Sequence, residues 1–139
     1  MMPTYFTLKE MTATDTGALN FPQTWEEVEN LQKLSARLDF IRAKCGFPIR
    51  VNSAYRSEEV NRLVGGVATS AHRLGLAADI CSYKGGEAEN NTLFSVAKQL
   101  INKLHIDQLI VYRKENKICF IHIGFKANDA DARGQILYK

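Results

Sequence analysis

A long amphipathic helix is the structural feature that the sequence specifies most strongly. Thr24 is followed three positions later by Glu27, a pair typical of the capping box that begins a helix. Apolar residues then recur at helical spacing, at Val28, Leu31, Leu34, Leu38, Ile41 and Cys45. Gly46 follows directly, and glycine at this position commonly ends a helix. The sequence therefore predicts a helix over residues 24–45.

The remainder of the chain predicts shorter elements. Strands are expected at residues 47–55, 75–83, 107–113 and 117–125, the last two joined by a polar turn at 114–117 into a hairpin. Shorter helices are expected directly after Ser57 and at residues 91–104, with residues 84–91 forming a loop. Helices placed before an antiparallel sheet indicate an α+β fold, in which a small antiparallel sheet is flanked by helices.

The length of the chain and its cysteines indicate one domain without disulfides. The 139 residues are enough for a single hydrophobic core. Residues 1–23 are expected to form an irregular N-terminal arm, and residues 126–139 a loosely ordered polar tail. Cys45, Cys81 and Cys119 are odd in number and lack CxxC spacing, which argues against a disulfide framework or a cysteine zinc finger.

Charge and hydropathy argue against several classes of partner. The formal net charge is +3, and Lys and Arg are scattered among Asp and Glu, unlike the basic stripe of a nucleic-acid-binding protein. The N-terminus lacks the apolar run of a signal peptide, and no segment is apolar enough to span a bilayer. We therefore expect no nucleic-acid partner and no membrane insertion, and we take the chain to be a monomer made in the cytoplasm. A function outside the cell would need release by lysis or from a phage particle.

The stretch TSAHRLGLAADI, residues 69–80, holds His72 and Asp79 among residues of little bulk. His122 lies in an otherwise apolar predicted strand, so the three would form a set of two histidines and one carboxylate. A catalytic Zn²⁺ takes three such ligands and keeps one position open. The spacing alone leaves a second interpretation open, because a single His or Asp in a strand is more often a packed or surface residue.

Arg56 and Ser70 also have two interpretations. Arg56 lies between a predicted strand and a predicted helix, where its guanidinium could hold a substrate carboxylate or form a surface ion pair. Ser70 could hydrogen-bond a peptide substrate or stabilise a turn.

Several motifs together resemble the zinc D-Ala-D-Ala carboxypeptidase family, peptidase M15. They are SAYRS at residues 53–57, the pair Gly65-Gly66, the pattern S-x-H-x-x-G-x-A-x-D at 70–79, and FIH at 120–122 in place of W-V-H. The resemblance runs from about Phe6 to Phe125 and is greatest to the phage-type, single-domain branch. Relatives of this branch include L-alanyl-D-glutamate endopeptidases and vancomycin-resistance dipeptidases, and the hedgehog signalling domain has a similar zinc fold.

This resemblance implies a site and a reaction. It implies Zn²⁺ as cofactor with His72, Asp79 and His122 as ligands, Arg56 as the group that holds a substrate carboxylate, and Ser70 as a hydrogen-bonding neighbour. The implied reaction is hydrolysis of an amide bond in a peptidoglycan stem peptide, which would make these peptides the partner. A bacterial or phage cell-wall peptidase is the expected setting.

One position departs from the family pattern. The family has a catalytic Glu near the last His, but this chain has Tyr112 or Cys119 at the positions where that Glu is found. Glu115 is the nearest Glu in sequence and lies in the predicted turn, and Tyr112 could donate a hydrogen bond to a developing oxyanion. Two functions therefore remain: an active zinc peptidase, or a zinc-containing module that binds cell-wall peptides without cleaving them.

Overall fold

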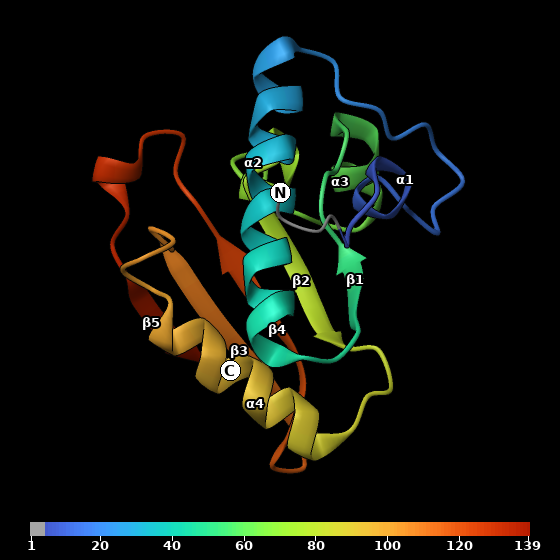
Figure 1. The fold of residues 1–139 in the computed structure, drawn as a ribbon. Helices are drawn as coiled ribbons and strands as arrows, with labels where there is room; N and C mark the ends of the chain where they lie inside the picture. The colour runs from blue at the N-terminus through green and yellow to red at the C-terminus, as the bar shows by residue number, and fades with distance from the viewer. Residues whose placement is uncertain (1–4) are drawn as a thin grey trace.

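The computed structural model describes residues 5–139 and shows one sheet with two long helices packed on it (Figure 1). The helices are α1 (Leu8–Met11), α2 (Trp25–Cys45), α3 (Glu58–Leu63) and α4 (Glu87–Gln99), with 3-10 turns η1 (Ala71–Leu74) and η2 (Asp129–Asp131). The strands are β1 (Ile49–Ser53), β2 (Ala77–Ser82), β3 (Gln108–Lys114), β4 (Lys117–Gly124) and β5 (Gln135–Tyr138). No helix within residues 5–139 is both long and apolar enough to cross a membrane.

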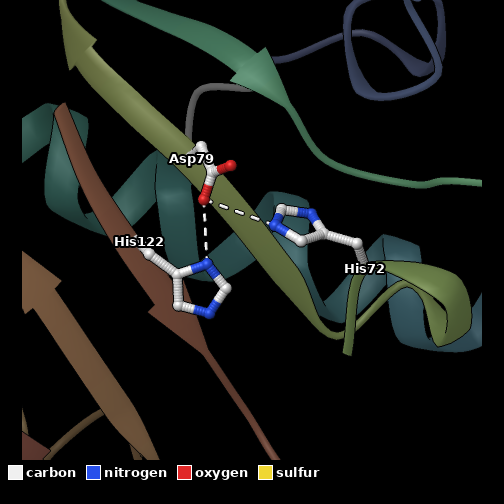
Figure 2. A group of neighbouring side chains, drawn as sticks. All are labelled: His72, Asp79 and His122. Atoms are coloured by element: carbon white, nitrogen blue, oxygen red, sulfur yellow. Dashed lines mark hydrogen bonds and ion pairs between the residues drawn. The ribbon is translucent and has the colours of Figure 1, made fainter. Parts of the chain in front are cut away.

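The sheet has the strand order β1-β2-β4-β3-β5 and confirms the predicted α+β class. All neighbouring strands are antiparallel except β3 and β5, which are parallel, so the sheet is mixed at one edge. Asp79 on β2 pairs in register with His122 on β4. Residues directly opposite one another in a sheet project from the same face, so these two side chains lie together (Figure 2).

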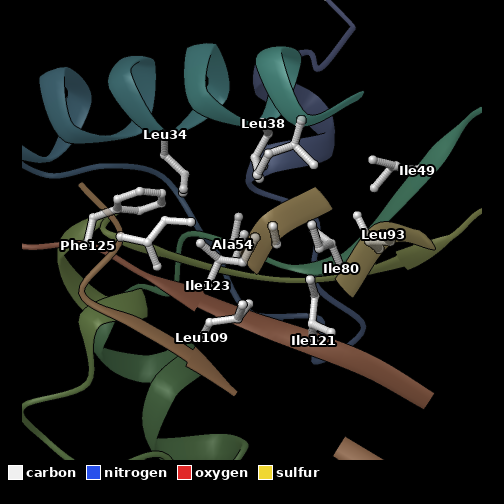
Figure 3. Packing of buried hydrophobic residues seen from close by; sticks show 14 of the residues in the cluster. Leu34, Leu38, Ile49, Ala54, Ile80, Leu93, Leu109, Ile121, Ile123 and Phe125 are labelled. Atoms are coloured by element: carbon white, nitrogen blue, oxygen red, sulfur yellow. The ribbon is translucent and has the colours of Figure 1, made fainter. Parts of the chain in front are cut away.

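The hydrophobic core lies on the other face of the sheet, beneath α2. Thr24 caps this helix by accepting a hydrogen bond from the Glu27 N–H at 3.1 Å, and Gly46 ends it in the left-handed conformation with a φ of 78°. Leu34 and Leu38 of α2 pack on alternate residues of the central strands, Ile80, Ile121 and Ile123 (Figure 3). Ile41 of α2 belongs to the same buried cluster. Each such burial contributes about 1.5–3 kcal/mol. Because α2 buries this face of the sheet, the polar residues of the site lie on the opposite face.

Residues 126–139 are not the loosely ordered tail that the sequence predicted. They contain η2 and the edge strand β5, which pairs with β3. The Gln135 N–H donates to the Asp107 carbonyl at 2.9 Å, and Arg133 donates to the Asp107 carboxylate from Nε and Nη2, each at 2.9 Å. Backbone pairing and this ion pair stabilise the segment. β5 is only four residues long, too short to show the alternating pattern by which a strand is predicted.

The second long helix, α4, begins and ends earlier than the sequence predicts. α4 begins at Glu87, within the predicted loop, and ends at Gln99, while residues 100–105 form turns. Glu87 and Glu89 lie in its first turn, where acidic side chains favour the helix dipole. Asn90 is a typical loop residue, yet its buried amide accepts from the Ser82 N–H at 2.7 Å and ties the helix to the sheet.

The N-terminal arm is irregular over most of the residues that the structure describes. One helical turn, α1, interrupts it, with Thr7 and Glu10 forming a capping box. Residues 1–4 of the predicted arm lie outside the described residues.

Candidate metal centre

The three predicted metal ligands lie together on the polar face of the sheet. Asp79 Oδ1 is 2.8 Å from His122 Nδ1 and 3.3 Å from His72 Nε2 (Figure 2). One potential ligand atom from each residue lies within 4.8 Å of the others. The residues come from η1, β2 and β4, so the site forms only when these three elements pack.

A tight turn carries His72 back over the strand that holds Asp79. Gly75 ends η1 in the left-handed conformation with a φ of 77°. A Cβ at this position would lie 3.0 Å from the Glu27 carbonyl oxygen, so the turn packs directly against the backbone of α2. Ala77 and Ala78 follow and are fully buried. The small residues of this stretch therefore permit the close packing that brings the two ligands together.

His72 is held in one orientation and one tautomer. Its Nδ1 lies 2.8 Å from the carbonyl oxygen of Ala54, so Nδ1–H donates and the lone pair of Nε2 faces Asp79. A metal-binding histidine commonly donates its second ring nitrogen to a carbonyl in this way. Ser70 accepts from the His72 N–H at 3.3 Å and caps η1. The structure thus places Ser70 beside a ligand as a support, and its contact with substrate stays a prediction.

His122 turns Nδ1 toward Asp79, whereas His72 turns Nε2 toward it. The Nε2 of His122 lies beside Gly124, where an added Cβ would be 3.3 Å away. The two histidine rings meet edge to face with centroids 5.1 Å apart. A side chain at residue 124 would therefore press on the ring.

The charges of the three residues suit a zinc ion. Burial alone would raise the pKa of Asp79, but its contacts with the His122 and His72 rings outweigh burial and hold the pKa well below its usual range. The carboxylate is therefore ionised at neutral pH. Tetrahedral ligands about 2.0–2.1 Å from zinc lie roughly 3.3 Å apart, close to the separations between Asp79 and the histidines. Two imidazole nitrogens and one carboxylate oxygen are ligands that Zn²⁺ takes, and their separations from Asp79 fit its spacing.

Arg56 lies directly beside this set. Its Nη2 is 3.6 Å from Asp79 Oδ2, and its Nε donates to Ser53 Oγ at 3.1 Å. Gly66 leaves room for the guanidinium, because a Cβ there would lie 3.2 Å from Arg56 Nη1 and 2.0 Å from Asn61 Oδ1. The predicted motif residues at 53, 56 and 66 therefore form one wall of the site.

Tyr112 shares the polar face with the ligands, whereas Glu115 does not reach them. Tyr112 pairs in register with Phe120, and the two rings stack with centroids 4.5 Å apart. Burial and the negative charge of Asp79 raise the pKa of Tyr112, so it is a neutral hydrogen-bond donor. Glu115 is exposed at the tip of the β3–β4 hairpin, where it and Asn116 adopt positive φ angles of 54° and 65°. The type of turn, which requires two such residues, keeps Glu115 away from the metal set.

Tyr55, Glu27 and Arg73 together support the site, a role that was not predicted from the sequence. The Tyr55 hydroxyl, fully buried, donates to Glu27 Oε1 at 2.5 Å, and Arg73 Nη1 lies 3.4 Å from the same oxygen. Glu27 thereby joins the start of α2 to the residues beside Arg56 and His72. The position of Tyr55 next to Arg56 was a signal for this role, but Glu27 was explained by helix capping alone.

The fold and the site define a metallopeptidase-type centre, with a two-histidine, one-carboxylate set and an adjacent arginine on a small α+β scaffold. The sequence matches the Peptidase M15 family over residues 4–124, and the chain belongs to that family. Members of this family are zinc peptidases, which agrees with the ligand set. Among curated proteins, none matches the chain.

Proposed function

We propose that the protein is a zinc-dependent peptidase that hydrolyses an amide bond in peptidoglycan stem peptides. The observation that carries the proposal is the convergence of His72 Nε2, Asp79 Oδ1 and His122 Nδ1 within 4.8 Å of one another. Zinc bound there would lower the pKa of water and polarise the scissile carbonyl. Membership of the M15 family supports a peptidase, and the substrate is our inference from the motifs.

The residues around the metal set can position the substrate. Arg56 has a planar guanidinium at the rim of the site and would hold a substrate carboxylate through two parallel hydrogen bonds. Ser53 anchors this guanidinium through Nε, so the hydrogens of Nη1 and Nη2 that do not face Asp79 can reach the substrate. Arg56 would thereby fix the peptide relative to the scissile bond.

Tyr112 is the residue that we assign to the developing negative charge. As a neutral phenol on the same face as His122, it can donate a hydrogen bond to the carbonyl oxygen as that oxygen becomes an oxyanion. It is a poor general base at neutral pH, because its pKa is raised above the usual value of about 10. Proton transfer by a positioned carboxylate contributes about 10²–10⁴ in rate, so we propose a slow peptidase.

A second candidate function rests on the same tyrosine. Within residues 5–139, Asp79 is the only carboxylate in the metal group, and the carboxylate of Glu89 is hydrogen-bonded to Ser82. A chain that keeps the ligands and the arginine but not the base could bind cell-wall peptides without cleaving them. Tyr112 at the expected position of the Glu is the observation that favours this alternative.

The test separates the two functions. The zinc-loaded protein is incubated with purified stem peptides, with and without a chelator, and the products are resolved by mass spectrometry. Chelator-sensitive cleavage supports the peptidase. Bound zinc without cleavage of any stem peptide contradicts it and supports the binding module.

A further inference from the structure

A polar groove begins beside the metal centre and runs along the outer edge of β1. Two cavities of about 180 and 340 Å³ adjoin and share Thr14, Asp15 and Asn52 among the residues that line them. The smaller cavity reaches Ser53 and Arg56, and the larger one reaches Arg50. The segment after α1 (Figure 1) supplies Ala13, Thr14, Asp15 and Thr16 to the lining of the smaller cavity.

The groove begins next to the metal centre. Ser53 pairs in register with Asp79, and Arg56 Nη2 lies 3.6 Å from Asp79 Oδ2. Both residues also line the smaller cavity. A peptide whose carboxylate is held by Arg56 would therefore extend along β1 once it leaves the metal centre.

The edge of β1 offers backbone groups to such a peptide. Within residues 5–139, β1 pairs only with β2. The Tyr83 N–H donates to the Pro48 carbonyl at 2.9 Å, so the alternation of an antiparallel ladder turns the N–H and C=O of Val51 toward the free edge. Val51 lines the larger cavity. An extended peptide can add to an exposed edge of this kind as a further strand.

The charges along the groove follow a definite order. Arg56 lies at the end near the metal, Arg50 at the far end, and the exposed Asp15 between them on the opposite wall. Among the described residues, Asp15 forms no ion pair, whereas Arg50 rests over the Tyr83 ring at 5.1 Å. This pattern is complementary to a peptide that presents an ammonium group between carboxylates.

We propose that the groove along β1 is a subsite for an extended peptide whose diamino acid residue places its side-chain ammonium group at Asp15. This proposal rests on the proposed function, because it assigns the diamino acid residue of the stem peptide to the groove. Asp15 would thus select peptides that carry a diamino acid over peptides with an uncharged residue at that position.

Binding and cleavage are measured separately, so that the two proposals can fail independently. Two fluorescein-labelled stem tripeptides are compared by anisotropy with the zinc-loaded protein: one carries lysine at the third position, and the other carries norleucine. The wild-type protein should prefer the lysine peptide by about twofold to fivefold, the range of an exposed ion pair, and the preference should shrink as salt is added. Absence of cleavage in a parallel assay would count against the proposed function alone.

Three variants complete the test. Asp15→Asn should abolish the preference, and Asp15→Lys should reverse it, while the norleucine peptide binds Asp15→Asn as it binds the wild type. Asp131→Asn, which removes an exposed carboxylate in η2, serves as the matched control and should keep the preference. An unchanged preference in Asp15→Asn, or no binding of either peptide to the wild-type protein, would overturn the proposal.

Discussion

Removing the hydroxyl of Tyr112 tests the stabilisation of the oxyanion that we assign to this residue. Tyr112→Phe keeps the ring that stacks on Phe120 at 4.5 Å, so the β3–β4 hairpin and the metal set should be preserved. If the phenol stabilises the oxyanion, its loss removes one positioned donor, which typically costs about 10²–10³ in kcat. Tyr112 is only half-buried, and water can replace part of its hydrogen bond, so we expect the lower end, about 10²-fold or about 2.7 kcal/mol in the barrier.

The assay is steady-state cleavage of a stem peptide by wild-type and Tyr112→Phe protein with equal zinc content. The decrease should appear in kcat, with KM little changed, because the interaction forms only as charge develops on the carbonyl oxygen. A Tyr112→Phe protein with the wild-type kcat would refute the assignment of Tyr112 to the oxyanion. A change in KM alone would mean that the hydroxyl binds the substrate in its ground state.

Three further predictions concern the base, the arginine and the C-terminal strand. Tyr112→Glu should raise kcat at least about tenfold over the size-matched Tyr112→Gln, because it restores a carboxylate for proton transfer; equal rates would show that position 112 is not where the base acts. Arg56→Ala should raise KM for a peptide with a free carboxylate while zinc content stays unchanged. Arg56→Lys should restore KM only poorly, since an ammonium cannot form the two parallel hydrogen bonds of a guanidinium. Loss of zinc in Arg56→Ala would instead assign the residue to the metal set. Asp107→Asn should lower the free energy of unfolding by about 1–2 kcal/mol at pH 7, a value discounted because Arg133 is half exposed. Hydrogen bonds from Arg133 lower the pKa of Asp107 below 3.8, so its contribution is present above pH 3.8 and is lost as the pH falls through the folded-state pKa. Urea unfolding at pH 7 and near pH 3 should therefore show a difference between the two proteins that shrinks with acidification, and a constant difference would contradict the ion pair.

Local signals explain which elements could be predicted from the sequence. The helix α2 begins at a capping Thr24 and ends at a left-handed Gly46, and both signals lie within the helix or next to it. The β3–β4 hairpin likewise turns at the polar residues where the sequence placed it. These features need no knowledge of the rest of the fold.

Elements that depend on distant partners could not be predicted in the same way. β5 is an edge strand held by pairing with β3 and by the contact of Arg133 with Asp107, neither of which is visible within the segment. α4 begins where Asn90 can reach the backbone of β2 and β4, so its start is decided by tertiary contacts.

The candidate site falls between these two cases. Spacing alone favoured ordinary packing over a metal site for His72, Asp79 and His122, because their proximity depends on the register of β2 with β4. The motif resemblance supplied the set, and the structure brings the three together. It also separates Tyr112, which lies on the polar face, from Glu115, which the turn holds at the exposed hairpin tip.

The most direct test of this account is the zinc content of the purified protein and of two ligand variants. Elemental analysis after dialysis against buffer with trace zinc should give about one zinc per chain for the wild type. His72→Ala and His122→Ala should lose it, together with the zinc-dependent increase in melting temperature, because binding to the folded state is linked to stability. A wild-type protein without zinc, or variants that retain a full equivalent, would contradict the metal centre on which the proposed function depends.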